Sequence, residues 1–474
     1  MQERKYIKEL NSFVGQEVVI AGWVDVRRDQ GKLVFMDLRD MTGKIQCVIL
    51  PNHVEAMNSA KEVRNEWVLK INGIVNKRPD KNINADVLNG DIELEITAIE
   101  VLNKAITPQF DVTTDGKEIG EDRRLKYRYI DLRRPRLQKN IRNRHKIAKF
   151  IRDFLDKENF IEIETPILTK STPEGARDFI VPSRLYKGAF YALPQSPQQY
   201  KQLLMSAGME RYFQLARCMR DEDSRGDRQP EFTQLDLEMS FVDREDVMDI
   251  NERLLIAIVE GLYPNKKIQQ IPFPRISYKE AMEKYGCDRP DLREDKNDQD
   301  LLAFCWVVDF PFFERTDKSD NPNTEGDWTF THNPFSGPVK EHKKWLMEGK
   351  NIGEILTTQY DIILNGFEIG GGSIRAHEPE MLKKVLEIIG HKEEDIEHNF
   401  GHMLGALSSG TPPHGGIAWG FDRVLMLLEN EPNIREVMTF PKTGEAKDLM
   451  MESPSFVSEK QLKELGIEIT KTKK

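Results

Sequence analysis

The stretch RDEDSRGDRQPEFTQLDLEMSF, from Arg220 to Phe241, decides the fold of this chain. It follows an alternating run, residues 211–219, and its own second half alternates polar and apolar side chains. Strand side chains alternate between two faces, so Gln234, Asp236 and Glu238 share one surface. The pattern predicts an antiparallel hairpin with a polar floor and Arg220 at its rim. Such a floor suits a small zwitterion and a phosphate; a solvated sheet face with a charged loop is the alternative.

Bulk properties narrow the class of protein. The chain has 474 residues, enough for two or three domains, and its net charge of −10 excludes a global basic field for nucleic acid. Basic residues gather locally instead, at Arg27 and Arg28 and in residues 123–128 and 133–136. The four cysteines form no CxxC pair, and there is no leader-like apolar segment or 18-residue apolar run. We therefore expect a soluble, cytoplasmic protein without a cysteine zinc site.

The first 103 residues read as five short strands. Runs at residues 18–26, 33–38, 45–50, 67–75 and 92–101 are separated by Gly, Asn and Asp turns. This spacing matches an OB-fold barrel, whose open face binds single-stranded nucleic acid. We place Arg28, Phe35 and Gln46 on that face, because an aromatic ring, an arginine and an amide recognise unpaired bases. The alternative is that Phe35 belongs to the barrel core and Arg28 is solvated.

The middle of the chain predicts a connector and a helix. Residues 104–138 are rich in Pro, Gly and Arg, which is typical of a linker or small hinge. Its arginines can contact a phosphate backbone, or the segment can be a solvated connector. From residue 139, Ile141, His145, Ala148, Ile151 and Leu155 recur at helical spacing. A short strand, residues 160–164, follows the helix. His145 is expected to be either a packing residue or a polar residue at the edge of this stripe, and not a catalyst.

A second hairpin is predicted around Asn365-Gly366, a strong type I′ turn signal. A two-residue loop pairs Ile363 with Glu368, and Asp361 then lies diagonally across from Glu368, about 7 Å away between Cβ atoms. One phosphate-bound Mg²⁺ can bridge that span. Two solvated surface acids are the alternative. The glycines at residues 370–372 then allow a close backbone approach before Arg375.

The Arg220–Phe241 segment resembles motif 2 of class II aminoacyl-tRNA synthetases, in the form of the bacterial-type aspartyl enzymes. The resemblance runs from the first strands nearly to the C-terminus. It implies an α+β multidomain fold: an anticodon-binding OB-fold (1–103), a hinge (104–138) and a catalytic domain on an antiparallel sheet flanked by helices (139–474). Motifs 1, 2 and 3 fall at about 139–166, 211–241 and 414–429. The large insertion usual in this family is truncated to about 286–300.

The resemblance also implies the chemistry and the partners. A member of this family forms aspartyl-adenylate and pyrophosphate from L-aspartate and ATP with Mg²⁺, and then acylates tRNA(Asp). Some members also charge tRNA(Asn), and residues near Gln30 and the 77–84 turn leave that choice open. Homodimerisation through motif 1 is implied as well. No side chain is required as a nucleophile, because the aspartate carboxylate itself attacks ATP.

Site residues are carried over position by position. The resemblance assigns catalysis to Arg220, Glu368 and Arg423, and Mg²⁺ to Asp361 and Glu368. It assigns aspartate to Glu174, Ser196, Gln198, Lys201, Asp236, His332 and Arg375. It assigns ATP to Arg220, Asp221, Glu222, Gln229, Phe232, Glu368, Gly420, Phe421, Asp422 and Arg423. It assigns the tRNA anticodon to Arg28, Phe35 and Gln46.

The pair Lys201 and Arg375 carries the specificity argument. Two cations at the side-chain end of the pocket favour a carboxylate over the amide of asparagine, and they repel a lysine substrate. This argues against an asparaginyl or lysyl relative with the same layout. A non-catalytic RNA-binding paralogue is expected to have lost Arg220, Glu368 or Arg423, and all three are present. Without the resemblance, Lys201 reads as a helix-surface lysine.

Overall fold

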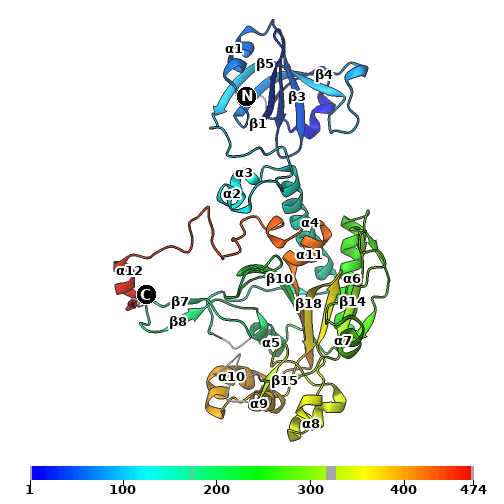
Figure 1. Cartoon of the computed structure of the whole chain (residues 1–474), viewed down its shortest axis with the longest axis vertical. Helices are drawn as coiled ribbons and strands as arrows, with labels where there is room; N and C mark the ends of the chain where they lie inside the picture. The colour runs from blue at the N-terminus through cyan, green and yellow to red at the C-terminus, as the bar shows by residue number, and fades with distance from the viewer. Residues whose placement is uncertain (1–2, 172–174, 317–326, 471–474) are drawn as a thin grey trace. The chain divides into compact units, whose positions relative to one another are not determined.

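The computed structural model of the chain describes residues 3–171, 175–316 and 327–470. It divides into two compact units (Figure 1). The first contains residues 1–119 and 129–135, and the second contains residues 120–128 and 136–474. Residues 104–135 are thus divided between the two units. The predicted hinge boundaries at 103 and 138 stay predictions.

The first unit is a closed five-stranded barrel, as the spacing of the five runs predicts. The strands are ordered β1-β2-β3-β5-β4 around the barrel. Their bounds are β1 (Glu17–Asp29), β2 (Val34–Arg39), β3 (Lys44–Ile49), β4 (Val68–Lys77) and β5 (Ile92–Asn103). A 3-10 helix η1 (Ile7–Phe13), helix α1 (Val54–Glu62), η2 (Asp80–Asn82) and the short α3 (Arg128–Asp131) accompany them. Alternate residues such as Val34, Met36 and Leu38 point into the barrel core, so the period-two pattern decides the inside.

The second unit is built on one eight-stranded sheet, ordered β12-β14-β17-β18-β19-β10-β9-β6. All pairings from β14 to β9 are antiparallel, and only the edge strands β12 and β6 pair in parallel. The bounds are β6 (Ile161–Glu162), β9 (Arg211–Met219), β10 (Glu231–Ser240), β12 (Arg275–Ser277), β14 (Phe304–Val308), β17 (Tyr360–Leu364), β18 (Phe367–Ile374) and β19 (His414–Gly420).

Smaller elements surround this sheet. The helices are α2 (Glu121–Lys126), α4 (Pro135–Lys157), α5 (Gln198–Ser206), α6 (Arg244–Leu262), α7 (Tyr278–Tyr285), α8 (Lys343–Glu348), α9 (Pro379–Ile388), α10 (Glu393–Ser408), α11 (Phe421–Leu428) and α12 (Glu459–Leu465). Two-stranded ribbons pair β7 (Ile180–Pro182) with β8 (Phe190–Ala192), β11 (Lys267–Ile268) with β13 (Leu301–Leu302), and β15 (Phe313–Arg315) with β16 (Trp328–Phe330). Among the described residues, no helix is both long and apolar enough to cross a bilayer.

The predicted hairpin at Arg220–Phe241 is present as β9 paired with β10. Leu235, Leu237 and Met239 enter the main apolar core, to which α4, α6 and α11 also contribute (Figure 1). Asp236 and Glu238 lie on the opposite face and are fully buried. This polar floor is therefore buried and not a solvated sheet face, and its carboxylates need charged partners because unpaired ionised groups are costly to bury.

Helix α4 is present, and it begins at Pro135, before the predicted residue 139. Its buried stripe runs through Ile147, Ile151 and Leu155. His145 is exposed, so of its two predicted places it takes the polar edge and not the packed stripe. With 3.6 residues per turn, the buried face of the helix passes through Ile147 instead.

The turn at Asn365-Gly366 is also present, with φ values of +51° and +85° that fit a type I′ turn. Ile363 pairs with Glu368 as predicted. A register shift between Ile362 and Ile363 then places Asp361 opposite Gly371, which the two-residue repeat did not predict.

Candidate active site and nucleic-acid face

A cavity of about 470 Å³ opens beside the charged turn between β9 and β10. Its walls come from that turn, from β18, and from the junction of β19 with α11. The predicted ATP-binding residues on this wall, together with His332, are Arg220, Glu222, Gln229, Phe232, Glu368, Gly420, Asp422 and Arg423. Segments up to two hundred residues apart therefore meet at one cavity.

Two guanidinium groups face this cavity. Arg220 lies 5.3 Å from the centroid of the Phe232 ring, and Arg423 forms an ion pair with Asp227 at 3.1 Å. Arg423 also donates to the backbone oxygen of Glu368. The Nε–H group of each arginine has no hydrogen-bond partner among the described residues. Buried unpaired donors are costly, so the two arginines form a site suited to an anion such as a phosphate.

Of the two acids of the second hairpin, Glu368 lines the same cavity, and Asp361 contacts His332, which also lines it. Asp361 accepts from Gln359 Nε2 at 2.7 Å, and its other oxygen lies 3.4 Å from His332 Nε2. Desolvation of the carboxylate and the neighbouring charge of Asp361 raise the pKa of Glu368. Burial would lower the pKa of His332, but Asp361 and Glu368 outweigh that effect and raise it. The acids are close enough to repel each other, which a cation between them would relieve.

The pair Asp361 and Glu368 fits a hard divalent cation in its donor chemistry. Mg²⁺ prefers oxygen ligands and is commonly held by one or two carboxylates together with substrate phosphates and water. Within the described ranges, no group of three or more His, Cys, Asp or Glu side chains could hold a metal by itself. The remaining ligands would therefore have to come from a bound nucleotide and water.

A second part of the site is a buried set of four charges, the pocket cluster: Lys201, Asp236, Glu238 and Arg375. Lys201 Nζ lies 2.7 Å from Asp236 Oδ1 and 3.3 Å from Glu238 Oε2. Arg375 holds Glu238 in a fork of two hydrogen bonds, at 2.8 and 2.9 Å. Lys201 is only 1% exposed, so it is not a helix-surface lysine. Both cations predicted for the substrate are thus paired with acids of the chain itself.

One acceptor of the pocket cluster is open. Asp236 Oδ2 is buried and has no hydrogen-bond partner among the described residues. The hydroxyl of nearby Tyr212 donates to Gln214 Oε1 at 3.0 Å instead. Burial raises the pKa of Asp236 in spite of Lys201. An uncompensated carboxylate oxygen at the floor of a site is suited to bind a cationic group.

The other acid of the cluster is fully engaged. Burial alone would raise the pKa of Glu238, but Arg375 and Lys201 outweigh it and hold the pKa at about 2. Strand β19 makes room for this carboxylate, because a Cβ atom at Gly416 would lie 2.1 Å from Glu238 Oε2. Glu238 therefore fixes the direction of Arg375 within the cluster.

The remaining predicted residues fall in several places. Ser196 accepts from the backbone N–H of Gln198 at the start of α5. Asp221 donates its backbone N–H to Arg177 O. Phe421 is buried in the apolar core and is not among the residues that line the cavity. Asp422 reaches the cavity but is also engaged by Arg144 and by the N–H of Thr233. Glu174 lies outside the described residues.

Sequence reasoning missed four residues of the site. Glu238 and Asp227 pair with the predicted Arg375 and Arg423. Gln202 Nε2 and His414 Nε2 lie 3.2 Å apart, and His414 is close to Glu238 of the pocket cluster. The period-two face containing Asp236 already included Glu238, and that signal could have identified it. The contacts of Asp227 and His414 join distant segments and leave no local signal, whereas Gln202 also contacts Gln198, four residues earlier on α5.

The barrel brings the predicted nucleic-acid residues together. Arg28 on β1 lies directly opposite Phe35 on β2, and Gln46 on β3 lies opposite Asp37. Phe35 is half-buried and is absent from the barrel core, so the core alternative is wrong for this ring. Arg28 pairs with Asp37 at 3.0 Å and is 45% exposed. An aromatic ring flanked by polar groups on an outer barrel face is an arrangement that can stack an unpaired base.

Comparison with known proteins agrees with both units. Residues 120–444 match the family model described as tRNA synthetases class II (D, K and N). Residues 18–102 match the OB-fold nucleic acid binding domain. The solved asparaginyl-tRNA synthetase from Pyrococcus horikoshii, complexed with asparaginyl-adenylate, shares the fold with a TM-score of 0.74 at 24% identity, covering 94% of this chain and 99% of that one. These matches define the class of the protein.

Curated relatives narrow the class. The aspartate–tRNA(Asp/Asn) ligase of Rubrobacter xylanophilus is 40% identical over 97% of this chain and 95% of that protein. The aspartate–tRNA ligase of Geobacillus kaustophilus is 39% identical over 99% of each. This chain therefore belongs to the class II tRNA synthetases, in the aspartate–tRNA ligase family. The alignment with the Rubrobacter protein spans 581 positions against 474 residues here, so over a hundred positions face gaps in this chain.

Proposed function

We propose that this chain activates L-aspartate with ATP and transfers the aspartate to the 3′ end of tRNA(Asp). In the first step an oxygen of the aspartate α-carboxylate attacks the α-phosphorus of ATP. The bond from that phosphorus to the β-phosphate oxygen breaks, and pyrophosphate leaves. The observation that carries the proposal is the pocket cluster, which presents two cations and one open carboxylate oxygen beside an arginine-lined cavity.

Each group in the cluster suits one part of aspartate. Lys201 and Arg375 favour the side-chain carboxylate, and the open Asp236 Oδ2 favours the α-ammonium. The cluster alone is balanced, with two positive and two negative groups. Aspartate adds one ammonium, which can bind the open oxygen of Asp236. It also adds two carboxylates, one for the two cations of the pocket and one that attacks ATP. Asparagine brings no second carboxylate.

At the nucleotide end, we assign Arg220 to the α-phosphate, where negative charge develops as the new bond forms. Arg423 also lines the cavity, and Phe232 offers a ring for the base. Asp361 and Glu368 would hold Mg²⁺, which when bound neutralises phosphate charge and helps to align the triphosphate. Positioning and charge stabilisation then account for the chemistry of this chain's own residues.

The first test is exchange of labelled pyrophosphate into ATP without tRNA. We expect exchange with L-aspartate and far weaker exchange with L-asparagine. Loss of a buried ion pair costs about 3–5 kcal/mol, and each 1.4 kcal/mol is about tenfold. Discrimination of at least a hundredfold is therefore expected. Equal exchange with the two amino acids would refute the assignment of Lys201 and Arg375.

The tRNA step is assigned to the barrel face. Phe35→Ala and Gln46→Ala should lower tRNA charging about ten- to a hundredfold, since one stacked base is worth roughly 1–3 kcal/mol. Arg28→Ala should act similarly, with a salt-dependent part. Pyrophosphate exchange should stay unchanged in the same preparations. A Phe35 variant that melts early yet charges tRNA normally would contradict the base-stacking role.

The range of tRNAs is the open part of this proposal. The relatives include a tRNA(Asp/Asn) ligase and an aspartate–tRNA ligase, so both specificities occur in the family. Charging of purified tRNA(Asp) and tRNA(Asn) with labelled aspartate distinguishes them. Aspartylation of tRNA(Asn) would make the product a substrate for an amidating enzyme.

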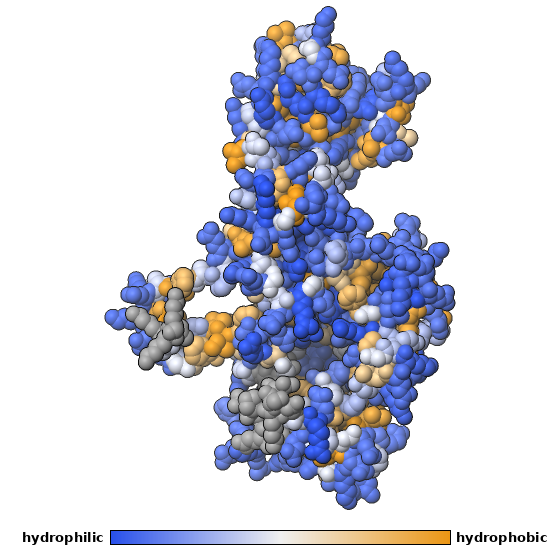
Figure 2. Space-filling model, viewed as in Figure 1, coloured by the Kyte–Doolittle hydropathy of each residue, from blue (hydrophilic) through white to orange (hydrophobic). Residues whose placement is uncertain are grey.

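We also propose that the chain works as a homodimer. The β7–β8 ribbon exposes apolar side chains, among them Ile180, Leu185 and Phe190 at 60%, 71% and 46%, and Figure 2 shows apolar surface along this ribbon. Exposed apolar clusters of this kind mark protein contacts. Sedimentation of the full chain tests the assembly, and a monomer at micromolar concentration would contradict it.

A further inference from the structure

Behind the amino-acid pocket, three polar side chains form a line of hydrogen bonds. Gln198 Nε2 lies 3.0 Å from Gln202 Oε1, one turn along α5. Gln202 Nε2 lies 3.2 Å from His414 Nε2, on the first residue of β19. His414 Nδ1 lies 2.8 Å from the backbone oxygen of Pro412. Gln202 and His414 are at most 1% exposed, so the protein alone decides the direction of these bonds.

The direction of the line is fixed at its far end. A backbone carbonyl can only accept, so Nδ1 of His414 must carry the hydrogen that reaches Pro412. Burial lowers the pKa of His414, which keeps the imidazole neutral at pH 7. In a neutral imidazole with a protonated Nδ1, Nε2 is an acceptor. Gln202 must then turn its amide N–H toward His414 and its oxygen toward Gln198.

The orientation of Gln202 in turn fixes that of Gln198. Because Gln202 presents an oxygen, Gln198 must present its amide N–H to it. The amide oxygen of Gln198 then lies on the other side of the group, available to an ammonium. An amide turned the other way would set N–H groups against the ammonium of the ligand. The orientation of the half-buried Gln198 amide is thus set by the backbone carbonyl of Pro412, two residues before β19.

We propose that Gln202 and His414 are positioning residues, which act through Gln198 to keep its amide oxygen directed at the α-ammonium of the amino acid. This rests on the proposed function, in which Gln198 contacts that group. Neither residue touches the substrate in this account. Their effect should appear only for ligands that carry the ammonium.

The test compares L-aspartate with succinate, which has both carboxylates and no ammonium. In Gln202→Met the amide of Gln198 is free to turn. A hydrogen bond to a charged group is worth tenfold or more, so the KM for L-aspartate in pyrophosphate exchange should rise about ten- to a hundredfold. The inhibition constant of succinate should change less than about twofold. Gln199→Met is the matched control, since Gln199 is also buried on α5 but accepts from His402 instead.

A double variant separates orientation from packing. In Gln198→Glu, both side-chain oxygens are acceptors, so no wrong orientation exists. Adding Gln202→Met in that background should raise the KM for L-aspartate by less than about threefold. His414→Leu provides a second route should Gln202→Met fold poorly, and it should show the same dependence on the Gln198→Glu background.

Two outcomes would overturn the inference in different ways. Equal losses from Gln202→Met in both backgrounds, or equal weakening of succinate and aspartate, would reduce Gln202 and His414 to packing residues. Absence of aspartate-dependent exchange in the unmodified chain would overturn the proposed function and the positioning role with it. Exchange measured on the unmodified chain therefore distinguishes the two failures.

Discussion

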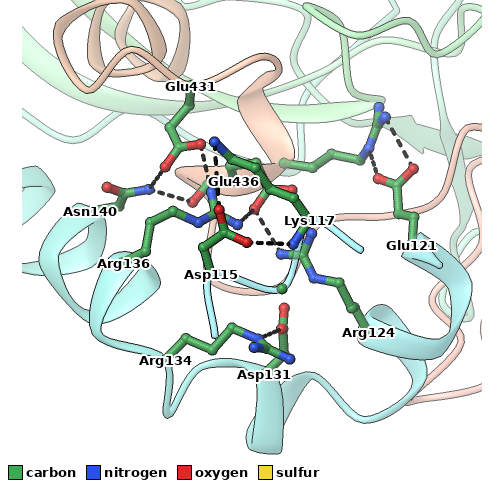
Figure 3. A network of polar contacts seen from close by, with 12 residues as sticks. Asp115, Lys117, Glu121, Arg124, Asp131, Arg134, Arg136, Asn140, Glu431 and Glu436 are labelled. Atoms are coloured by element: carbon green, nitrogen blue, oxygen red, sulfur yellow. Dashed lines mark hydrogen bonds and ion pairs between the residues drawn. The ribbon is translucent and has the colours of Figure 1, made fainter. Parts of the chain in front are cut away.

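The second unit contains two largely buried clusters of four charges, and they differ in whether every carboxylate oxygen has a donor. One is the pocket cluster. The other, the helix cluster, consists of Arg124, Arg136, Glu431 and Glu436 (Figure 3). In the helix cluster Arg124 meets both oxygens of Glu436 at 2.9 and 2.8 Å, and Arg136 bridges Glu436 and Glu431 at 2.8 and 2.6 Å. Asn140 fills the last acceptor, Glu431 Oε1, at 2.7 Å.

The difference separates a structural role from a binding role. Every carboxylate oxygen of the helix cluster has a donor, so a ligand would have nothing to add. In the pocket cluster, Asp236 Oδ2 has no donor among the described residues. Buried charges alone therefore do not identify a site, because ion-pair networks that hold a fold together are also buried. In the pocket cluster, the open acceptor lies next to two cations and beside an arginine-lined cavity, and this combination distinguishes it from the helix cluster.

The largest effect is expected for Lys201→Met. It removes the only partner of Asp236 Oδ1 within the described residues and one of the two cations proposed for the substrate. We expect kcat/KM for aspartate to fall by at least a hundredfold, while the KM for ATP stays nearly unchanged. Pyrophosphate exchange with each substrate varied in turn measures both values.

A second substitution tells whether the loss is only one of stability. Removing one partner of a buried pair costs about 3–5 kcal/mol, so Lys201→Met should also lower the melting temperature. Adding Asp236→Asn removes the stranded charge and should restore much of the stability. Activity should stay low in the double variant. Recovery of activity together with stability would place the pocket cluster in the same structural class as the helix cluster.

Arg124→Met is the corresponding change in the helix cluster. Arg136 still neutralises part of Glu436, so we expect a loss on the order of 3 kcal/mol in unfolding free energy. The kcat/KM for aspartate, measured per folded molecule at low temperature, should remain within about twofold of the unmodified chain. A large catalytic loss in a folded Arg124 variant would contradict the division drawn here.

The sequence predicts one side of this comparison better than the other. Period-two alternation placed Asp236 and Glu238 on one face, and the five runs predicted the barrel, because both depend on neighbours along the chain. The partners Lys201 and Arg375 are 35 and 137 residues away from those acids. A local sequence pattern does not predict which distant side chains contact a given strand face. The resemblance to the family predicted Lys201 and Arg375 instead.

Two further features lay beyond any local rule. The register shift before Ile363 depends on how β18 fits against both β17 and β19, where its glycines allow close approach. His145 matches the helical spacing of its neighbours, yet the buried face turns through Ile147. In each case tertiary packing, and not intrinsic propensity, selects the outcome.

The smallest expected effect concerns acid stability. The pKa of Glu436 is held at about 2, since Arg124 and Arg136 outweigh the opposing effect of burial. A carboxyl with a lowered folded pKa stabilises the protein above its unfolded value, here 4.5, and loses that contribution as pH falls toward 2. Unfolding free energy should therefore fall across this window. Glu436→Gln should make the fall shallower, by up to about 1.4 kcal/mol per pH unit for one proton.

The pocket cluster should respond less, because its two acids shift in opposite directions. The pKa of Glu238 is held at about 2, and it loses its contribution below 4.5 in the same way as Glu436. The pKa of Asp236 is raised, so this group favours folding as pH falls through its folded value toward 3.8. Between pH 6 and 2 the two contributions partly cancel. Urea midpoints of the unmodified chain, Glu436→Gln and the double variant Asp236→Asn/Glu238→Gln across that range measure the difference. If the double variant flattened the acid limb more than Glu436→Gln, Asp236 would be an ordinary paired acid, and its open oxygen would no longer distinguish the pocket cluster.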